Sequence, residues 1–372
     1  MSDMSRRTAL QGALALTVAA PLAARAQTAA PEAHTFAPKP GAWRRFEVAT
    51  SVTAPAANGE TQLWLPAPDL ARPFQRSLGD TWTGNATSVR LVEDTAKGVR
   101  LLHATFAADV AQPTLTLTST VETQDRAVDW SARATPHAEP ADLRRWLQPT
   151  ALHPVDGIVR DTAQKAIGGA TSDEDKVRAI YNWMVSTCFR DPGVKGCGAG
   201  EIKTMLESGN LGGKCADLSA LFVAMSRSVG VPAREMYGVR LAPSAFGYKQ
   251  LGATSASLTG AQHCRAEVWL SRYGWVAMDP ADVLKVMRQE TPTWIRDPGD
   301  ALVAPVDAGL YGGWEGNWVA WNTVNDVALP GAQHGATVSF LMYPQGENAA
   351  GRFDELAPAT FAYTIAAREI AV

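Results

Sequence analysis

One segment near the middle of the chain limits the fold more than any other. Gly212-Gly213-Lys214 leads directly into Cys215, and a helical pattern begins at that cysteine. Gly230-Val231-Pro232 ends the pattern, because proline cannot continue a helix. The apolar positions between these limits lie mostly three or four residues apart: Leu218, Leu221, Phe222, Met225 and Val229. The spacing predicts an amphipathic helix from Cys215 to about Val229, with the cysteine in its first turn.

Strand patterns follow this helix. Three segments have the length and composition of strands: 235–241, 264–270 and 275–278. The last two are separated by the turn Ser271-Arg272-Tyr273-Gly274, so they predict a hairpin. A buried helix followed by antiparallel strands indicates an α+β domain, to which we assign residues 140–290.

A second helix is expected upstream, inside the same domain. Ser172 has the residue type of an N-cap, and Asp175 three positions later completes a capping box. The apolar residues that follow lie on one face of a helix: Val177, Ile180, Tyr181 and Met184.

β-rich sequence flanks this domain on both sides. Thr114-Leu115-Thr116-Leu117-Thr118 alternates polar and apolar residues as a half-buried strand does. Similar segments occur throughout residues 41–128, which we expect to form a sandwich-like domain without catalytic residues. Residues 291–372 predict a C-terminal β-rich extension.

The first residues have the form of an export signal. Arg6-Arg7 precedes an apolar stretch, and Ala24-Arg25-Ala26 resembles a cleavage site. The paired arginines are similar to those of twin-arginine signals. We expect residues 1–26 to be removed and residues 27–40, rich in alanine and proline, to form a linker. The mature protein would then be periplasmic or extracellular, without stable insertion in a membrane.

The composition excludes several other classes of protein. Of the 372 residues, 46% are hydrophobic and 19% are charged, so the chain can bury large cores and is not disordered. Its 34 basic and 37 acidic side chains lack the basic surplus of proteins that bind nucleic acid. The four cysteines include no Cys-x-x-Cys pair, and no calcium-loop pattern occurs. We therefore expect no nucleic acid partner, no metal and no cofactor.

Cys215, His263 and Asp279 have the residue types and expected positions of a catalytic triad. The positive end of the helix dipole lowers the pKa of a thiol at Cys215, and the N–H groups of the first turn can bind an oxyanion. His263 precedes the first strand of the hairpin and Asp279 follows the second, so the acid can orient the imidazole. The expected substrate-binding residues are Gly213, Lys214 and Trp275.

These residues resemble the motifs of the transglutaminase-like superfamily of papain-type thiol enzymes, and secreted bacterial members in particular. The cysteine motif is Gly213-Lys214-Cys215-Ala216-Asp217-Leu218, and the histidine motif is His263 with Glu267. The acid motif is Gly274-Trp275 with Asp279-Pro280. The resemblance covers residues 170–285 and implies a papain-like core. In that family the three residues act as nucleophile, general base and orienting acid.

Two positions depart from the pattern of the family. Cys264 follows His263, where many members carry a small residue and then tryptophan. Gly209, six residues before Cys215, supplies no side chain as a second oxyanion donor. The expected donor is therefore the backbone N–H of Cys215.

The resemblance implies acyl transfer at an amide through a thioester. If water resolves the thioester, the protein is a cysteine peptidase or amidase, which is the outcome that secreted bacterial members favour. If an amine resolves it, the protein is a cross-linking transglutaminase. A binding protein that kept the fold but lost turnover is the third alternative, and the complete triad argues against it. The expected partner is a peptide or protein, and the expected location points to cell-wall peptide.

Two further features leave alternatives open. Cys188 and Cys197 flank a turn-rich segment and either form a disulfide or remain unpaired. Cys264 is expected to be a small buried residue rather than a second nucleophile. The tryptophans of the segment Trp314–Asn322 either line a substrate groove or pack in the interior. Their spacing does not match one face of a strand, which favours packing.

Overall fold

The computed structural model describes residues 35–372, apart from 56–58, 69–71, 95–96, 133–135 and 358. The predicted signal of residues 1–26 lies outside these residues, as does most of the predicted linker. Among the described residues, no helix is long and apolar enough to cross a bilayer.

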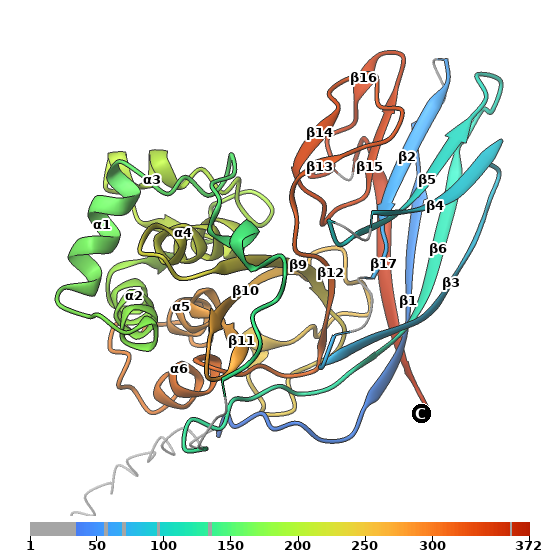
Figure 1. Cartoon of the computed structure of the whole chain (residues 1–372). Helices are drawn as coiled ribbons and strands as arrows, with labels where there is room; N and C mark the ends of the chain where they lie inside the picture. The colour runs from blue at the N-terminus through green and yellow to red at the C-terminus, as the bar shows by residue number, and fades with distance from the viewer. Residues whose placement is uncertain (1–34, 56–58, 69–71, 95–96, 133–135, 358) are drawn as a thin grey trace, which may run out of the picture. The chain divides into compact units, whose positions relative to one another are not determined.

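Strands from both ends of the described chain form two antiparallel sheets (Figure 1). The N-terminal strands are β1 (Arg44–Thr53), β2 (Thr61–Pro66), β3 (Gln75–Gly84), β4 (Ser88–Asp94), β5 (Val99–Phe106) and β6 (Thr114–Thr123). The C-terminal strands are β15 (Gln345–Asn348), β16 (Gly351–Arg352) and β17 (Ala362–Ile370). One sheet has the order β17-β1-β6-β3, and the other has the order β16-β15-β2-β5-β4.

The two β-rich regions expected as separate domains therefore share both sheets. β17 pairs with β1 along its length, from Ile370 opposite Arg45 to Ala362 opposite Thr53. β15 pairs with β2 in the second sheet. The boundaries 41–128 and 291–372 thus do not separate two independent domains. Long-range strand pairing of this kind leaves no signal in the local pattern from which those boundaries were predicted.

The alternation of apolar and polar residues explains which faces of these strands are buried. β1 and β6 bury one face, with Phe46, Val48 and Leu117 pointing into the core that they share with β2 and β5. β2 is buried on both faces, because Trp64 joins a second apolar cluster on the opposite side. That cluster is closed by residues in and around the hairpin of β13 (Asn325–Ala328) and β14 (Thr337–Phe340).

The α+β part is built on a four-stranded antiparallel sheet with the order β11-β10-β9-β12. Its strands are β9 (Ala233–Arg240), β10 (Gln262–Leu270), β11 (Gly274–Met278) and β12 (Trp318–Asn322). Its helices are α1 (Ile158–Ile167), α2 (Asp173–Thr187), α3 (Ile202–Ser208), α4 (Cys215–Ser228), α5 (Pro280–Gln289) and α6 (Ala304–Leu310). Short 3-10 helices occur at η1 (Leu143–Leu147) and η2 (Lys249–Leu251), and β7 (Phe189–Arg190) pairs in parallel with β8 (Gly212–Gly213).

α4 is the central helix of this part (Figure 1). It contacts β9 and β10 on one side and α1, α2 and α5 around the others. Almost every residue of α4 is buried, which is typical of a helix enclosed by other elements. β12, at the other edge of the sheet, contacts β5 and β6 and so joins the sheet to the β-rich part.

The main local predictions for this part are confirmed. α4 begins at Cys215, and the hairpin of β10 and β11 places Ala266 opposite Met278. α2 follows Ser172, whose hydroxyl oxygen accepts the backbone N–H of Asp175 at 3.1 Å.

Three differences from the prediction concern segments near its boundaries. The domain extends past residue 290, because α6 and β12 belong to it. α5 was not predicted, although Asp279 as N-cap and Pro280 at the first position are ordinary start signals of a helix. The end of the predicted linker is folded, since Phe36 is 5% exposed and packs on Phe246 and Tyr248.

The close contact between β9 and β12 generates a stability prediction. A Cβ on Gly238 would collide with the carbonyl oxygen of Val319 and lie 2.6 Å from the ring of Trp318. We expect Gly238→Ala to lower the free energy of unfolding by about 1–3 kcal/mol, measured by urea denaturation. Gly169→Ala is the matched control, because its Cβ would meet nothing within 4 Å, and we expect a change below about 0.5 kcal/mol. Equal effects of the two substitutions would contradict this packing.

Candidate active site

Cys215 is held at the start of α4 by the carboxylate of Asp217. One oxygen of Asp217 accepts the N–H of Lys214 at 3.0 Å, and the other accepts the N–H of Gly200 at 2.8 Å. A Cβ on Gly198 would collide with this carboxylate, so glycine is required there. These two hydrogen bonds of Asp217 hold the loop before α3 against the first turn of α4. In that turn the N–H of Cys215 has no acceptor within the helix.

His263 lies on β10 with its imidazole turned toward two carboxylates. Its Nε2 is 2.8 Å from Oδ2 of Asp279 and 3.2 Å from Oδ2 of Asp282. The backbone carbonyl of His263 accepts the indole N–H of Trp318 at 3.0 Å. With Nε2 occupied in this way, Nδ1 is the ring nitrogen that remains to exchange a proton with Cys215.

Asp279 uses its two carboxylate oxygens for different purposes. Oδ1 accepts the backbone N–H of Asp282 at 3.0 Å and so caps α5. Oδ2 contacts the imidazole of His263. The same side chain therefore fixes the start of a helix and the orientation of the base.

Asp282 is a second acid at the imidazole, and Arg240 neutralises it. Nη2 of Arg240 donates to both oxygens of Asp282, at 2.6 and 2.7 Å. Ligand-type atoms of His263, Asp279 and Asp282 lie within 4.8 Å of one another, which is close enough for a metal ion. The guanidinium of Arg240 already supplies positive charge to Asp282, so we assign the group as an ion-pair network.

These charges determine the protonation state of the base. Burial and the neighbouring Arg240 lower the pKa of His263, but Asp282 and Asp279 raise it by more, to about 9. Burial raises the pKa of Asp282, but the neighbouring Arg240 and the imidazolium of His263 lower it by more. The pKa of Asp282 therefore lies well below its usual range. The imidazole is accordingly a cation at neutral pH, and it faces the ionised carboxylate of Asp282.

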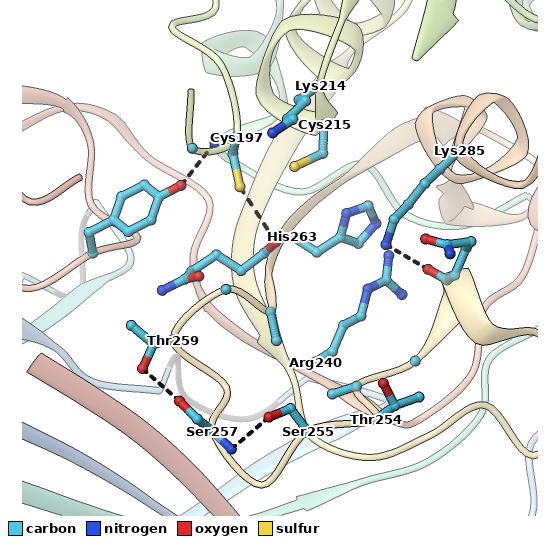
Figure 2. Close-up of a pocket in the computed structure, with 18 of the residues that line it drawn as sticks. Cys197, Lys214, Cys215, Arg240, Thr254, Ser255, Ser257, Thr259, His263 and Lys285 are labelled. Carbon is cyan, nitrogen blue, oxygen red and sulfur yellow. Dashed lines mark hydrogen bonds between the residues drawn. The ribbon is translucent and has the colours of Figure 1, made fainter. Parts of the chain in front are cut away.

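The pKa of the Cys215 thiol is lowered well below its usual range. The largest cause is a hydrogen bond from the thiol of Cys197, followed by one from Cys264, and the nearby His263 adds to them against the effect of burial. Cys197 Sγ also lies 3.4 Å from the carbonyl oxygen of Gln262 (Figure 2). Thiolate and imidazolium therefore face each other before substrate arrives, which is the reactive form of a thiol nucleophile.

All four cysteines are free. The disulfide alternative for Cys188 and Cys197 is therefore absent from this structure. Cys264 is fully buried, as expected, and its Sγ lies 3.8 Å from Sδ of Met342.

A cavity of about 980 Å³ opens at the thiol and the imidazole (Figure 2). Cys215, His263 and Lys214 line it, and Figure 2 shows Lys214 beside Cys215. Gly213 and Trp275, also expected to contact substrate, are not among the residues that line it. A Cβ on Gly213 would lie 2.7 Å from Cβ of Asp217, so this glycine permits close packing instead.

Trp275 and the tryptophans of residues 314–322 have packing roles. Trp275 lies edge-on against Trp269 and under the guanidinium of Arg234, 3.8 Å from its ring centre. Trp314, Trp318 and Trp321 are each at most 2% exposed, which confirms packing rather than an open groove. Trp318 also supports the site through its bond to the carbonyl of His263.

Sequence reasoning missed three residues at the site: Asp282, Arg240 and Cys197. Asp282 had a signal, since it follows the N-cap Asp279 by three positions in the first turn of α5. Arg240 and Cys197 had none, because their roles depend on contacts between segments distant in the chain.

Comparison with known proteins identifies the family. The model of the transglutaminase-like superfamily matches residues 160–280. A Haemophilus influenzae protein of uncharacterized function is 31% identical over 333 residues, which cover 86% of this chain and 89% of that protein. The chain belongs to the transglutaminase-like superfamily. Cys215, His263 and Asp279 all lie inside the matched region.

One solved structure shows the same fold, and a second aligns more weakly. A protein from Cytophaga hutchinsonii, described as a candidate cysteine protease, aligns with a TM-score of 0.56 at 15% identity, over 90% of this chain and 93% of that one. The periplasmic domain of TgpA from Pseudomonas aeruginosa aligns with a TM-score of 0.35 at 15% identity, over 69% of this chain and 75% of that one. We rest the fold of this superfamily member on the first alignment alone.

The ion pair of Cys215 and His263 predicts the pH profile of thiol alkylation. The thiolate is present above the lowered pKa of Cys215 and is lost as the pH falls through it. We expect rapid iodoacetamide labelling of Cys215 at pH 6, with a further inflection near pH 9 where His263 loses its proton. In His263→Ala the rise in labelling rate that reports ionisation of Cys215 shifts to higher pH, because the cation beside the thiol is gone. His334→Ala is the control, because His334 is exposed and does not line the cavity. An unchanged pH profile in His263→Ala would refute the ion pair of Cys215 and His263.

The buried pair of Arg240 and Asp282 predicts a large effect on stability. We expect Asp282→Asn to lower the free energy of unfolding by about 3–5 kcal/mol, because it leaves the buried Arg240 without its counter-charge. The same substitution should also lower the pKa of His263 from about 9, because it removes the negative charge of Asp282 that raises this pKa. Glu47→Gln breaks an exposed pair with Arg368 and should cost less than about 1 kcal/mol. Urea denaturation and NMR titration of the imidazole measure the two effects, and comparable losses in both variants would contradict the assignment.

Proposed function

We propose that this protein is an exported thiol hydrolase that cleaves amide bonds in peptides through a thioester on Cys215. The observation that carries the proposal is the pairing of a thiol of lowered pKa with an imidazole held by two carboxylates, at the wall of a cavity. Structural packing alone requires no such arrangement of charges.

The reaction follows from the positions of these groups. The thiolate of Cys215 attacks the amide carbonyl, and the N–H at the start of α4 stabilises the oxyanion. His263 gives its proton to the amide nitrogen, the C–N bond breaks and the amine leaves. Water then attacks the thioester while His263 accepts its proton, and the C–S bond breaks to release the acid and restore Cys215. Asp279 holds the imidazole in the required orientation throughout.

The size of the cavity supports a peptide substrate. A volume of about 980 Å³ is at the upper end of ligand pockets and accommodates several residues of a peptide.

The place of action is part of the proposal. The paired arginines, apolar stretch and small residues of positions 1–26 support export by a twin-arginine-type route to the periplasm or cell exterior. Cell-wall peptides are substrates available in that compartment.

A cleavage assay in isotopically labelled water tests the function. Mature protein is incubated with a mixture of synthetic peptides in H₂¹⁸O, and products are analysed by mass spectrometry. We expect one ¹⁸O in each new carboxyl group, and Cys215→Ser should reduce the rate by at least about 10³-fold. Cys188→Ala is the control, because Cys188 is buried and does not line the cavity.

Two outcomes would overturn the proposal. Products that carry an added primary amine instead of ¹⁸O would identify transamidation rather than hydrolysis. An intact peptide mixture, together with iodoacetamide labelling of Cys215 no faster than that of Cys188, would show that the site is not a thiol enzyme.

A further inference from the structure

The cavity beside Cys215 carries an excess of positive charge. Its basic lining residues come from well-separated parts of the chain: Arg190, Lys214, Arg240, Lys249 and Lys285. Among the described residues that line it, Glu355 alone is acidic. The whole chain has a formal net charge of −3, so this concentration of positive charge is local. Concentrations of this kind attract anions.

Among the described residues, most of these cations form no ion pair with an acid. Arg240 is neutralised by Asp282 and contributes little to the net charge. In the part of the chain that the structure describes, Arg190, Lys249 and Lys285 form no ion pair. Nε of Arg190 donates to the uncharged amide of Gln289 at 3.2 Å, which leaves its other guanidinium nitrogens free for a ligand.

Lys285 is the most enclosed of these unpaired cations. Its side chain comes from α5, and its Nζ donates to the backbone carbonyl of Gln250 at 2.7 Å. An ammonium has three N–H donors, so two remain. Burial and the neighbouring Arg240 lower its pKa to about 8, and it therefore still carries its charge at pH 7. Asp282 and Cys215 oppose this lowering of the pKa, but among the described residues neither forms an ion pair with Lys285, so an entering anion would stabilise the half-buried cation.

The position of Lys285 indicates which part of a substrate it meets. Figure 2 shows Lys285 and Arg240 on the same side of Cys215 as the imidazole of His263, with Cys197 on the other side. The imidazole must reach the departing nitrogen to protonate it. The wall beyond the imidazole therefore faces the amine part of the substrate.

We propose that Lys285, together with Lys249 and Arg190, binds a carboxylate on the amine side of the scissile amide. The inference rests on the proposed amide hydrolysis and narrows its substrates to peptides whose released part is anionic close to the cleaved bond. The carboxylate is either the C-terminal group of a single released residue or the side chain of an acidic residue.

Two alkylating reagents of similar size test the cationic wall without a known substrate. Iodoacetate carries a carboxylate and iodoacetamide is neutral, and both alkylate a thiolate. The rate of Cys215 alkylation by iodoacetate is divided by the rate with iodoacetamide, both measured at pH 7 by peptide mapping. This ratio is then divided by the same ratio for glutathione, which gives the normalised ratio. We expect the normalised ratio to exceed one by about tenfold or more, and to fall toward one as salt is raised from 10 to 500 mM.

Lysine variants then identify the residues responsible. The normalised ratio should fall several-fold in Lys285→Gln and in Lys249→Gln. Lys249→Gln also tests the proposal by itself if Lys285→Gln fails to fold. Lys203→Gln is the control, because Lys203 lies on α3 outside the cavity and its side chain is 69% exposed. Rapid reaction with iodoacetamide but a normalised ratio near one would refute the carboxylate site and leave the thiol enzyme intact. Slow reaction with both reagents would instead refute the proposed function.

Paired peptides distinguish the two sources of the carboxylate. One pair differs only in a C-terminal acid or carboxamide on the released residue, and the other differs in Glu or Gln at that residue. We expect the acid of one pair to be cleaved with at least about tenfold higher kcat/KM, and Lys285→Gln to remove that preference. Equal cleavage within both pairs would overturn the proposal.

Discussion

The site depends on one buried carboxylate, that of Asp279, which serves a helix and an imidazole at once. Its Oδ1 starts α5 and its Oδ2 holds Nε2 of His263, so the helix cannot shift without moving the base. Asp282 and Arg240 complete the group, and all of these side chains are buried. Buried charges are tolerated only when they are paired, so α5, β9 and β10 must reach their places together.

The same principle explains why the thiol needs neighbours of its own. A buried thiolate is unfavourable, yet hydrogen bonds from Cys197 and Cys264 and the charge of His263 lower the pKa of Cys215. The backbone N–H of Cys197 donates to the hydroxyl oxygen of Tyr343, shortly before β15. The β-rich part thus supports the loop beside Cys215, so the α+β part is not self-sufficient.

Much of the local structure could be predicted because its causes are local. The stripe of apolar residues after Cys215, the capping box at Ser172 and the turn before Gly274 each act within a few residues. The order of Cys215, His263 and Asp279 along helix and hairpin was readable for the same reason. Trp275 and Gly213 do not line the cavity, because a residue next to a motif can equally serve packing, as the positions of Arg234 and Asp217 show.

The sequence by itself determined which elements form and that a cysteine, a histidine and an acid stand at their ends. Only the tertiary structure decided that β17 pairs with β1, that Arg240 neutralises Asp282 and that lysines from distant segments gather around the cavity. Hydrogen bonding and periodicity along a helix or hairpin act over a few residues and leave a pattern in the chain. Pairing between buried charges and between distant strands depends on distances in space, which no spacing along one chain specifies.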